Sequence, residues 1–353
     1  MKFRADIQGL RAIAVIAVIA HHAFPQVITG GFIGVDLFFV ISGYLITQIL
    51  VESSSKPLLT YLSDFYARRV RRILPSALLV IVATTFASYR ILGPVTGSDT
   101  ARDGLWSSFF LANWHFNQLA IDYFNSALPL PILQHYWSLA IEEQFYLLWP
   151  IILFALIKFR VPPLFGIGSI TVASLAYCVA NNGSSASYFS TLTRVWELGA
   201  GSILALSNFH FPKRLWSNLS LLLFIALVFI YDQNTPFPGL PALWVVLIGV
   251  SLLMTSHTNG MLKNRALVYV GDLSFVLYLW HWPILQIARL DGWTSTTRIW
   301  IALGAIIALS IATHHAFENP IRYSKISSRL ALVLGAAGLT LSTALLEGMR
   351  NLL

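Results

Sequence analysis

Residues 32–51, FIGVDLFFVISGYLITQILV, form an apolar run of 20 residues in which the one charged residue is Asp36. About 20 apolar residues in a helix are what the roughly 30 Å hydrocarbon core of a bilayer requires. Ten further apolar stretches of spanning or near-spanning length flank it, at 8–24, 73–92, 137–158, 162–180, 193–208, 215–231, 239–255, 268–288, 297–317 and 330–348. The sequence therefore predicts an all-α, polytopic integral membrane protein with about eleven transmembrane helices.

The composition excludes a soluble enzyme. The chain is 56% hydrophobic and only 11% charged, whereas soluble domains carry about 25% charged residues. Its net charge of +8 would suggest nucleic acid in a soluble protein, but in a membrane protein basic residues mark the cytoplasmic side. We therefore expect no nucleic-acid partner. The single cysteine, Cys178, excludes an internal disulfide and a thiolate metal cluster.

The basic residues predict the topology. A twelfth candidate span, residues 105–119, is short and polar. If it does not cross and the N-terminus is inside, 17 of the 23 basic residues face the cytoplasm; if it crosses, the division becomes 12 against 11. The positive-inside rule favours the first arrangement, with the N-terminus cytoplasmic and the C-terminus extracytoplasmic. Residues 94–136 then form a long outer-face stretch, partly re-entrant or interfacial.

Two ionisable residues of the first span share one helix face. This span lacks a signal-peptide cleavage pattern, so we expect it to be retained. Arg11 and His22 are eleven residues apart, which is about 1100°, or three turns plus about 20°. They are separated along the axis by roughly 16 Å, whereas His21 is rotated away. Charges inside spans are costly and usually functional, so His22 is a candidate general base, with a structural hydrogen bond as the alternative.

Three carboxylates are candidates for assisting His22. Asp36 is as far from the turn near Thr29 as His22 is, so the two are expected at similar depth, where Asp36 would orient the imidazole. Its alternative partner is an arginine or a backbone amide. Glu142 and Glu143 lie early in their span, and because neighbours on a helix differ by about 100°, at most one faces the same cavity as His22.

Other ionisable residues in the spans are interpreted as structural. Arg194 and Glu197 are spaced to pair on one helix face. His281 lies between two tryptophans and is expected to act as an interfacial hydrogen-bonding residue. His314 and His315, followed by Glu318, are expected to be scaffolding near the inner face.

A dense basic cluster begins the third span. Arg68, Arg69, Arg71 and Arg72 fall within five positions. They are topology determinants beside anionic lipid, but one or two positive charges would be enough for that role. Together with Arg11, four planar guanidiniums form a suitable site for a multiply phosphorylated ligand such as coenzyme A, a nucleotide or a phospholipid headgroup.

In this order along the chain, the motifs resemble those of the membrane-bound acyltransferase family 3. The matching segments are Arg4-x-Asp6-Ile7-Gln8-Gly9-Leu10-Arg11-Ala12, His22, Gly34-Val35-Asp36-x-Phe38-Phe39-Val40-Ile41-Ser42-Gly43-Tyr44-Leu45-Ile46, Arg68-Arg69-x-x-Arg72-x-x-Pro75, Trp137-Ser138-Leu139-x-x-Glu142-Glu143-Gln144-Phe145-Tyr146, Tyr278-Leu279-Trp280-His281-Trp282-Pro283 and Glu318-Asn319-Pro320-Ile321-Arg322. The family often has Leu-His just before its Trp-Ser-Leu, and Leu133-Gln134-His135-Tyr136 departs from that spacing.

The resemblance implies transfer of an acyl group, usually acetyl, from cytoplasmic acetyl-CoA to an extracytoplasmic hydroxyl, commonly on a surface polysaccharide such as lipopolysaccharide O-antigen. It implies a multi-pass protein of the bacterial inner membrane with acetyl-CoA as acyl donor, and no metal is expected. The family's essential first-span residues fall on Arg11 and His22, and its arginine cluster falls on Arg68, Arg69 and Arg72. We therefore expect these arginines to bind the donor, with His22, Asp36, Glu142 and Glu143 as catalytic candidates.

The resemblance also predicts the domain organisation. Residues 1–328 correspond to the acyltransferase-type transmembrane domain, and residues 329–353 to an additional final transmembrane helix and a short outer tail. Many relatives with this extra span continue into an extracytoplasmic SGNH-type domain, so the chain is similar to the membrane half of such an enzyme. The expected partners are the acyl-CoA donor, a glycan acceptor, membrane lipids and an SGNH-type domain or protein.

Two functions from other classes remain open. A transporter or flippase for an anionic or lipid-linked sugar would explain the arginines and the intramembrane carboxylates, but not the alignment of Arg11 with His22, and no internal repeat is visible. A metal enzyme built on His21, His22 and His281 is less favoured, because adjacent histidines on a helix point in different directions.

Overall fold

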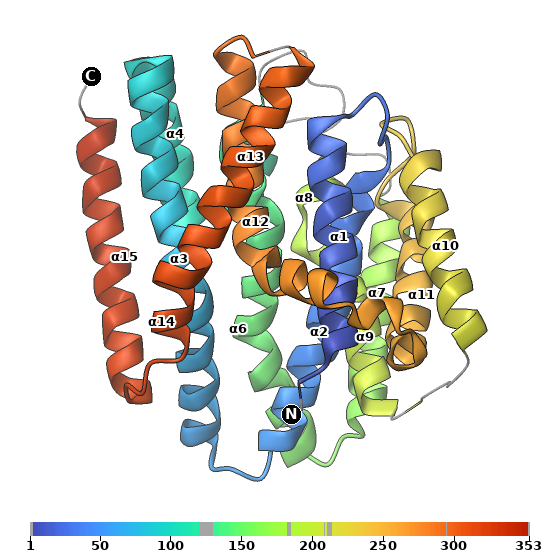
Figure 1. Ribbon diagram of the computed structural model, residues 1–353. Coiled ribbons are helices and arrows are strands. Elements are labelled where there is room, and N and C mark those ends of the chain that lie inside the picture. The colour runs from blue at the N-terminus through green and yellow to red at the C-terminus, as the bar shows by residue number, and fades with distance from the viewer. Residues whose placement is uncertain are drawn as a thin grey trace. The chain divides into compact units, whose positions relative to one another are not determined.

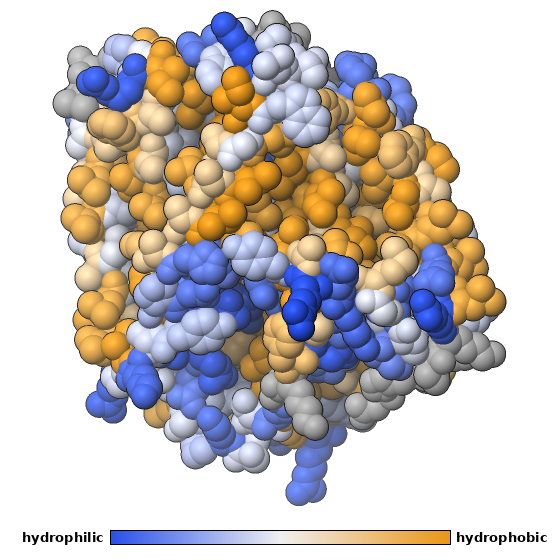
Figure 2. All heavy atoms as spheres, in the orientation of Figure 1, coloured by the Kyte–Doolittle hydropathy of each residue, from blue (hydrophilic) through white to orange (hydrophobic). Residues whose placement is uncertain are grey.

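The computed structural model describes residues 3–119, 130–181, 185–207, 209, 214–293 and 295–351. Within these ranges the secondary structure consists of helices, with no β-strand. Seven of the helices are long and apolar enough to cross a membrane, and a shorter apolar helix, α10, adds to them. Large areas of the face in Figure 2 are covered by hydrophobic residues, as expected of a surface that meets lipid. The prediction of an all-α, polytopic membrane protein is confirmed.

Every apolar stretch that the sequence singles out as a span coincides with a helix (Figure 1). These helices are α1 (Ala5–Ala23), α2 (Gly34–Ser53), α3 (Leu58–Leu92), α6 (Tyr136–Lys158), α7 (Pro163–Ala180), α9 (Thr191–Ser207), α10 (Arg214–Ile230), α11 (Gly239–Thr255), α12 (Arg265–Leu290), α13 (Thr296–Thr313) and α15 (Ser328–Arg350). Three of them, α1, α9 and α12, are not among the seven helices that are long and apolar enough, and they are not counted with α10 either. Ionisable residues or a shorter length account for this. How many of the helices cross the membrane, and in which direction, stays a prediction.

The polar candidate span at 105–119 is not a single helix. Helix α4 (Pro94–Ser108) ends before Phe110, whose φ of 56° lies in the left-handed region, and α5 (Ala112–Gln118) follows. A non-glycine residue with that conformation interrupts a helix. The remainder of the predicted outer-face stretch includes residues 120–129, which lie outside the described residues.

The described chain forms two compact units. The first unit contains residues 3–55 and 141–274, and the second contains residues 56–119, 130–140 and 275–351. Helices α6 and α12 each contribute residues to both units. In the first unit α2 packs against α9, and α9 packs against α7. In the second unit α15 lies alongside α3 and α4 (Figure 1).

The contact between α2 and α9 depends on two glycines. A Cβ at Gly43 would lie 1.8 Å from the backbone oxygen of Leu198, and a Cβ at Gly201 would lie 2.0 Å from the backbone oxygen of Val40. No side chain fits at such distances, so each glycine allows one backbone to approach the other. In membranes, where lipid is as apolar as leucine, helices associate through this kind of close packing.

We therefore expect Gly43→Ala to lower the free energy of unfolding by about 1–3 kcal/mol, because the methyl group forces α2 away from α9. The matched control is Gly168→Ala in α7, where a Cβ meets nothing within 4 Å. Thermal unfolding of the purified protein in detergent, followed by tryptophan fluorescence, measures both. Equal melting temperatures for the two variants would contradict the close approach.

Candidate active site

Helix α1 carries Arg11 and His22 without interruption, so the helical phase that places them on one face applies over the whole distance between them. Arg11 Nη1 donates a hydrogen bond to Gln8 Oε1 at 3.1 Å. The His22 side chain is buried, with a residue exposure of 8%. His21 Nδ1 lies 2.8 Å from the carbonyl oxygen of Ile28, which links it to the turn after α1. The two adjacent histidines therefore have different surroundings, as the phase predicts.

A buried charge cluster joins α2 to α9. Arg194 Nη1 lies 2.8 Å from Asp36 Oδ1 and 2.6 Å from Glu197 Oε1, and all three side chains are at most 1% exposed. The predicted pairing of Arg194 with Glu197 is thus present. The partner that the structure gives Asp36 is Arg194, which is the alternative considered beside an orienting contact with His22. One guanidinium serves two carboxylates in a site removed from water.

Aromatic rings complete the surroundings of this guanidinium. The rings of Phe39, Tyr188 and Phe237 have their centroids 5.9, 5.1 and 5.3 Å from Arg194 Cζ. An arginine is attracted to the face of an aromatic ring, most strongly where water is excluded. The cluster therefore combines ion pairs with cation–π contacts and is held from several directions.

Of the glutamates in α6, Glu142 contacts α2. Ser42 Oγ donates a hydrogen bond to Glu142 Oε1 at 2.8 Å, and the hydroxyl of Tyr146 donates to Oε2 at 3.3 Å. One turn of α2 therefore carries Ser42 beside Glu142 and Gly43 beside α9. The first unit thus contains all four catalytic candidates, namely His22, Asp36, Glu142 and Glu143. Their individual roles stay predictions.

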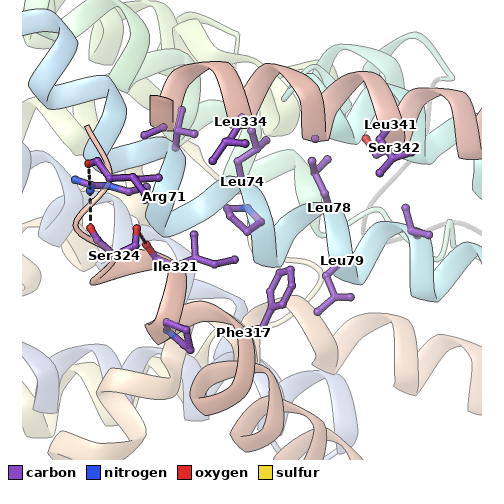
Figure 3. Close-up of a pocket in the computed structure, with 18 of the residues that line it drawn as sticks. Arg71, Leu74, Leu78, Leu79, Phe317, Ile321, Ser324, Leu334, Leu341 and Ser342 are labelled. Carbon is purple, nitrogen blue, oxygen red and sulfur yellow. Dashed lines mark hydrogen bonds between the residues drawn. The ribbon is translucent and has the colours of Figure 1, made fainter. Parts of the chain in front are cut away.

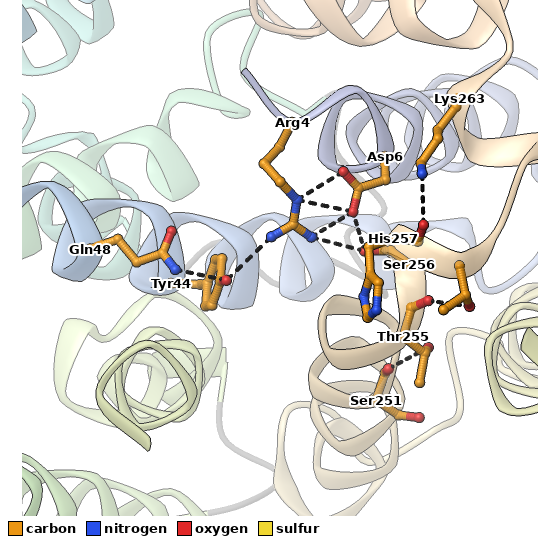
Figure 4. Close-up of polar contacts among 10 residues, drawn as sticks. Arg4, Asp6, Tyr44, Gln48, Ser251, Thr255, Ser256, His257 and Lys263 are labelled. Atoms are coloured by element: carbon orange, nitrogen blue, oxygen red, sulfur yellow. Dashed lines mark hydrogen bonds and ion pairs between the residues drawn. The ribbon is translucent and has the colours of Figure 1, made fainter. Parts of the chain in front are cut away.

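The family motifs include Arg4 and Asp6 but do not predict the polar network in which these residues fix the start of α1 (Figure 4). Arg4 Nη2 forms an ion pair with Asp6 and donates to Ser256 Oγ at 3.3 Å, while Nη1 donates to the hydroxyl of Tyr44 at 3.4 Å. Ser256 Oγ in turn donates to Asp6 Oδ2 at 2.6 Å. The hydrogen bond with Asp6 raises the pKa of the Arg4 guanidinium above its ordinary value. The network attaches α1 to α2 and to the segment after α11, and its signal in the sequence is Arg4-x-Asp6.

The arginine cluster lies on α3, in the second unit. The guanidinium of Arg69 lies over the ring of Phe65, 5.8 Å from its centroid, and Arg68 is exposed. Arg71 Nη1 donates to the backbone oxygens of Ser324 and Ile326 at 2.9 and 3.2 Å. The cluster is therefore not a set of four equivalent charges: Arg71 binds the chain after α14 (Asn319–Arg322).

Three further histidines, His135, His281 and His314, have partners within the second unit. His281 Nδ1 lies near the carbonyl oxygen of Tyr278, and His135 Nε2 lies 3.1 Å from that of Leu279. His281 is fully buried, so it is a hydrogen-bonding residue of the protein interior. His314 Nδ1 lies 2.9 Å from Glu318 Oε2, in agreement with a scaffolding role. Among the described residues, no three histidine, cysteine or acidic side chains form a group suited to holding a metal ion.

The fold is that of a helical membrane protein, and ionisable side chains are buried among its apolar helices. The chain belongs to a membrane acyltransferase family, whose model, described as an acyltransferase domain, matches residues 4–315. The resemblance seen in the motifs is thereby confirmed, and the chain is identified as an acyltransferase-type membrane protein.

The chain is similar to proteins described as O-acetyltransferases. It is 34% identical to the peptidoglycan O-acetyltransferase OatA of Listeria monocytogenes, over 91% of this chain and 56% of that protein. It is 33% identical to the putative peptidoglycan O-acetyltransferase YrhL of Bacillus subtilis, over 91% and 55%, and 30% identical to a putative O-acetyltransferase of Staphylococcus aureus, over 91% and 58%. The chain thus spans little more than half the length of these relatives. No solved structure matches the chain.

The buried charge cluster is expected to contribute to the free energy of unfolding. Arg194→Gln removes the one cation between two buried carboxylates, and we expect it to lower the free energy of unfolding by about 3–5 kcal/mol. The matched control is Arg350→Gln, which breaks an exposed ion pair with Glu347 that is worth at most about 1 kcal/mol. Thermal unfolding in detergent compares the two. A melting temperature for Arg194→Gln as high as that of the control would contradict a stabilising role for the cluster.

Proposed function

We propose that the chain transfers an acetyl group from cytoplasmic acetyl-CoA across the membrane to a hydroxyl of an extracytoplasmic polysaccharide. The observation that carries the proposal is the arrangement on α1, where Arg11 and His22 share one face of an unbroken helix roughly 16 Å apart. A cationic residue at the cytoplasmic end of that face suits a phosphorylated donor, and a buried imidazole further along suits proton transfer. Membership of an acyltransferase family supports this assignment.

The proposed donor site uses the arginines on α3. Coenzyme A carries three phosphate groups, and guanidiniums bind phosphate through paired, charge-assisted hydrogen bonds. Arg68, Arg69 and Arg72 are the residues onto which the family's arginine cluster falls, and Arg11 is a further candidate. These arginines are predicted to lie at the cytoplasmic end of the spans. They would therefore face the compartment in which acetyl-CoA is available.

In the proposed reaction, His22 acts as general base. It accepts the proton of the acceptor hydroxyl as that oxygen attacks the thioester carbonyl; the C–S bond breaks, a C–O ester bond forms, and the proton passes to the departing CoA thiolate. An acyl-histidine intermediate is the alternative route. Asp36 contributes through Arg194, which fixes α2 against α9, and Glu142 or Glu143 assists in proton handling.

The names of the relatives favour peptidoglycan as the acceptor over the lipopolysaccharide O-antigen. Two of them are described as peptidoglycan O-acetyltransferases, one of these as putative. Both are longer than this chain, so an additional extracytoplasmic domain or protein of the SGNH type is a proposed partner in the final transfer. The proposed location is the bacterial cytoplasmic membrane, where both substrates can be reached.

The rival function, a transporter for an anionic or lipid-linked sugar, is favoured by no specific contact in the described residues. It would use the basic and acidic groups as binding sites but gives the buried His22 no task. Transport driven by protons depends on the membrane potential, whereas acetyl transfer depends on acetyl-CoA.

The test of the proposed function is the rate of CoA release from acetyl-CoA by the purified protein in the presence of peptidoglycan fragments. We expect His22→Gln to reduce this rate by about 10²–10⁴-fold, because glutamine can hydrogen-bond but cannot accept the proton. The matched control is His21→Gln on the neighbouring position, which we expect to retain most of the rate. Equal rates for wild type and His22→Gln would contradict the proposal.

A further inference from the structure

The second unit contains an apolar cavity between α3, α14 and α15 to which the acyl transfer chemistry assigns no role (Figure 3). We propose that it binds one acyl chain of an acidic phospholipid, whose phosphate is held by Arg71. The proposal concerns this unit alone and does not depend on the proposed acetyl transfer.

The cavity has the size and chemistry of a hydrocarbon site. Its volume is about 570 Å³, within the range of roughly 300–1,000 Å³ that is usual for sites of small organic molecules. Apolar residues line most of it, among them Leu74 and Leu78 of α3, Leu341 of α15 and Phe317. Such a lining matches an acyl chain, because it offers many dispersion contacts and few hydrogen bonds.

The length of the cavity matches one leaflet of a bilayer. Along α3 its lining runs from Val70 to Val82, and the part from Arg71 to Val82 spans eleven helical steps, or roughly 16 Å. Half of a hydrocarbon core of about 30 Å is about 15 Å. Figure 3 places Arg71 at one end of the cavity and Leu341 and Ser342 at the other. A lipid with its phosphate beside Arg71 would therefore extend its chain along the cavity toward the middle of the bilayer.

The charge of Arg71 makes an acidic lipid the best match. Its two hydrogen-bond acceptors are the neutral backbone oxygens of Ser324 and Ile326, and none of the ion pairs among the described residues includes it. Its Nε is buried without a hydrogen-bond partner. A buried donor without an acceptor is costly, so a phosphate oxygen at this position would satisfy both the charge and the orphan N–H.

The cavity is open to the lipid on the side of α15. Leu334, Leu341 and Leu345 line it and yet are 53%, 63% and 43% exposed. Gly338 widens it, since a Cβ there would meet only Leu78 Cδ1, at 3.6 Å. A chain from the surrounding bilayer can therefore enter sideways. A zwitterionic lipid such as phosphatidylcholine also offers a phosphate, but its choline cation would lie close to the Arg71 guanidinium and repel it. A helix of another protein would be too wide for a cavity that takes one chain.

The test uses photoreactive lipids in nanodiscs of phosphatidylcholine that contain the full chain. One probe is phosphatidylglycerol with a diazirine in one acyl chain, and the other is phosphatidylcholine with the same chain. Mass spectrometry of the cross-linked peptides maps the sites. We expect the phosphatidylglycerol probe to label residues 74–82 of α3 and 334–345 of α15 about tenfold more than the phosphatidylcholine probe does, because the choline cation of phosphatidylcholine repels Arg71 and phosphatidylglycerol carries no such cation.

Two variants and their controls separate the charge from the cavity. Arg71→Gln should remove the preference for phosphatidylglycerol, whereas Arg265→Gln, at an exposed arginine that does not line the cavity, should not. Gly338→Leu fills the cavity and should remove labelling by both probes, whereas Gly304→Leu, at a glycine with open space around it, should not. Equal labelling by the two probes in wild type, or cross-links that avoid these segments, would overturn the proposal. Because the two variants act at different residues, failure of one to fold still leaves the other as a test.

Discussion

One guanidinium, that of Arg194, lies between the carboxylates of Asp36 and Glu197 in a part of the first unit that water does not reach. Separating such charges is costly, because any one of them left alone in an apolar interior loses its counter-charge without gaining water. Asp36 belongs to α2 and the other two to α9, so the cluster allows these helices only a narrow range of positions. Gly43 and Gly201 allow the approach that the ion pair requires.

The position of α2 in turn determines where other polar groups lie. Ser42, next to Gly43, donates to Glu142 on α6, and Tyr44 accepts a hydrogen bond from Arg4 before α1. One short segment of α2 therefore contacts α6, which carries Glu142 and Glu143, and the residue that precedes α1. In this interpretation Asp36 is a positioning residue, which acts through Arg194 on the packing of α2.

The sequence predicted the helices well and their neighbours poorly. Length and apolar character are local properties, so each predicted span coincides with a helix, and the polar stretch at 105–119 is interrupted near Phe110. The different surroundings of His21 and His22 also followed from a local property, the helical phase. The partner of Asp36 could not be predicted in this way, because Arg194 is 158 positions further along the chain and the sequence between them contains no signal for which helices pack together. The same limit applies to Arg71, which in the sequence is one of four similar arginines.

The ionisable residues of the chain are divided between its two predicted sides. The basic residues of α3 and the Arg11 end of α1 are predicted at the cytoplasmic side, whereas the buried His22 lies near the other end of α1. Such a division suits a reaction whose donor and acceptor are in different compartments. It would have no purpose in an enzyme that binds both substrates from one side.

The proposed transmembrane acetyl transfer is tested most directly by tracing the acetyl group across a sealed membrane. Inside-out vesicles containing the protein, with peptidoglycan fragments enclosed, receive labelled acetyl-CoA in the external solution, which meets the cytoplasmic face. We expect the label to appear in the lumen, as acetylated glycan or as acetate, while free CoA accumulates outside and dissipation of the membrane potential has no effect. Release of all labelled product outside the vesicles, or uptake that requires the potential and not acetyl-CoA, would contradict the proposed transfer.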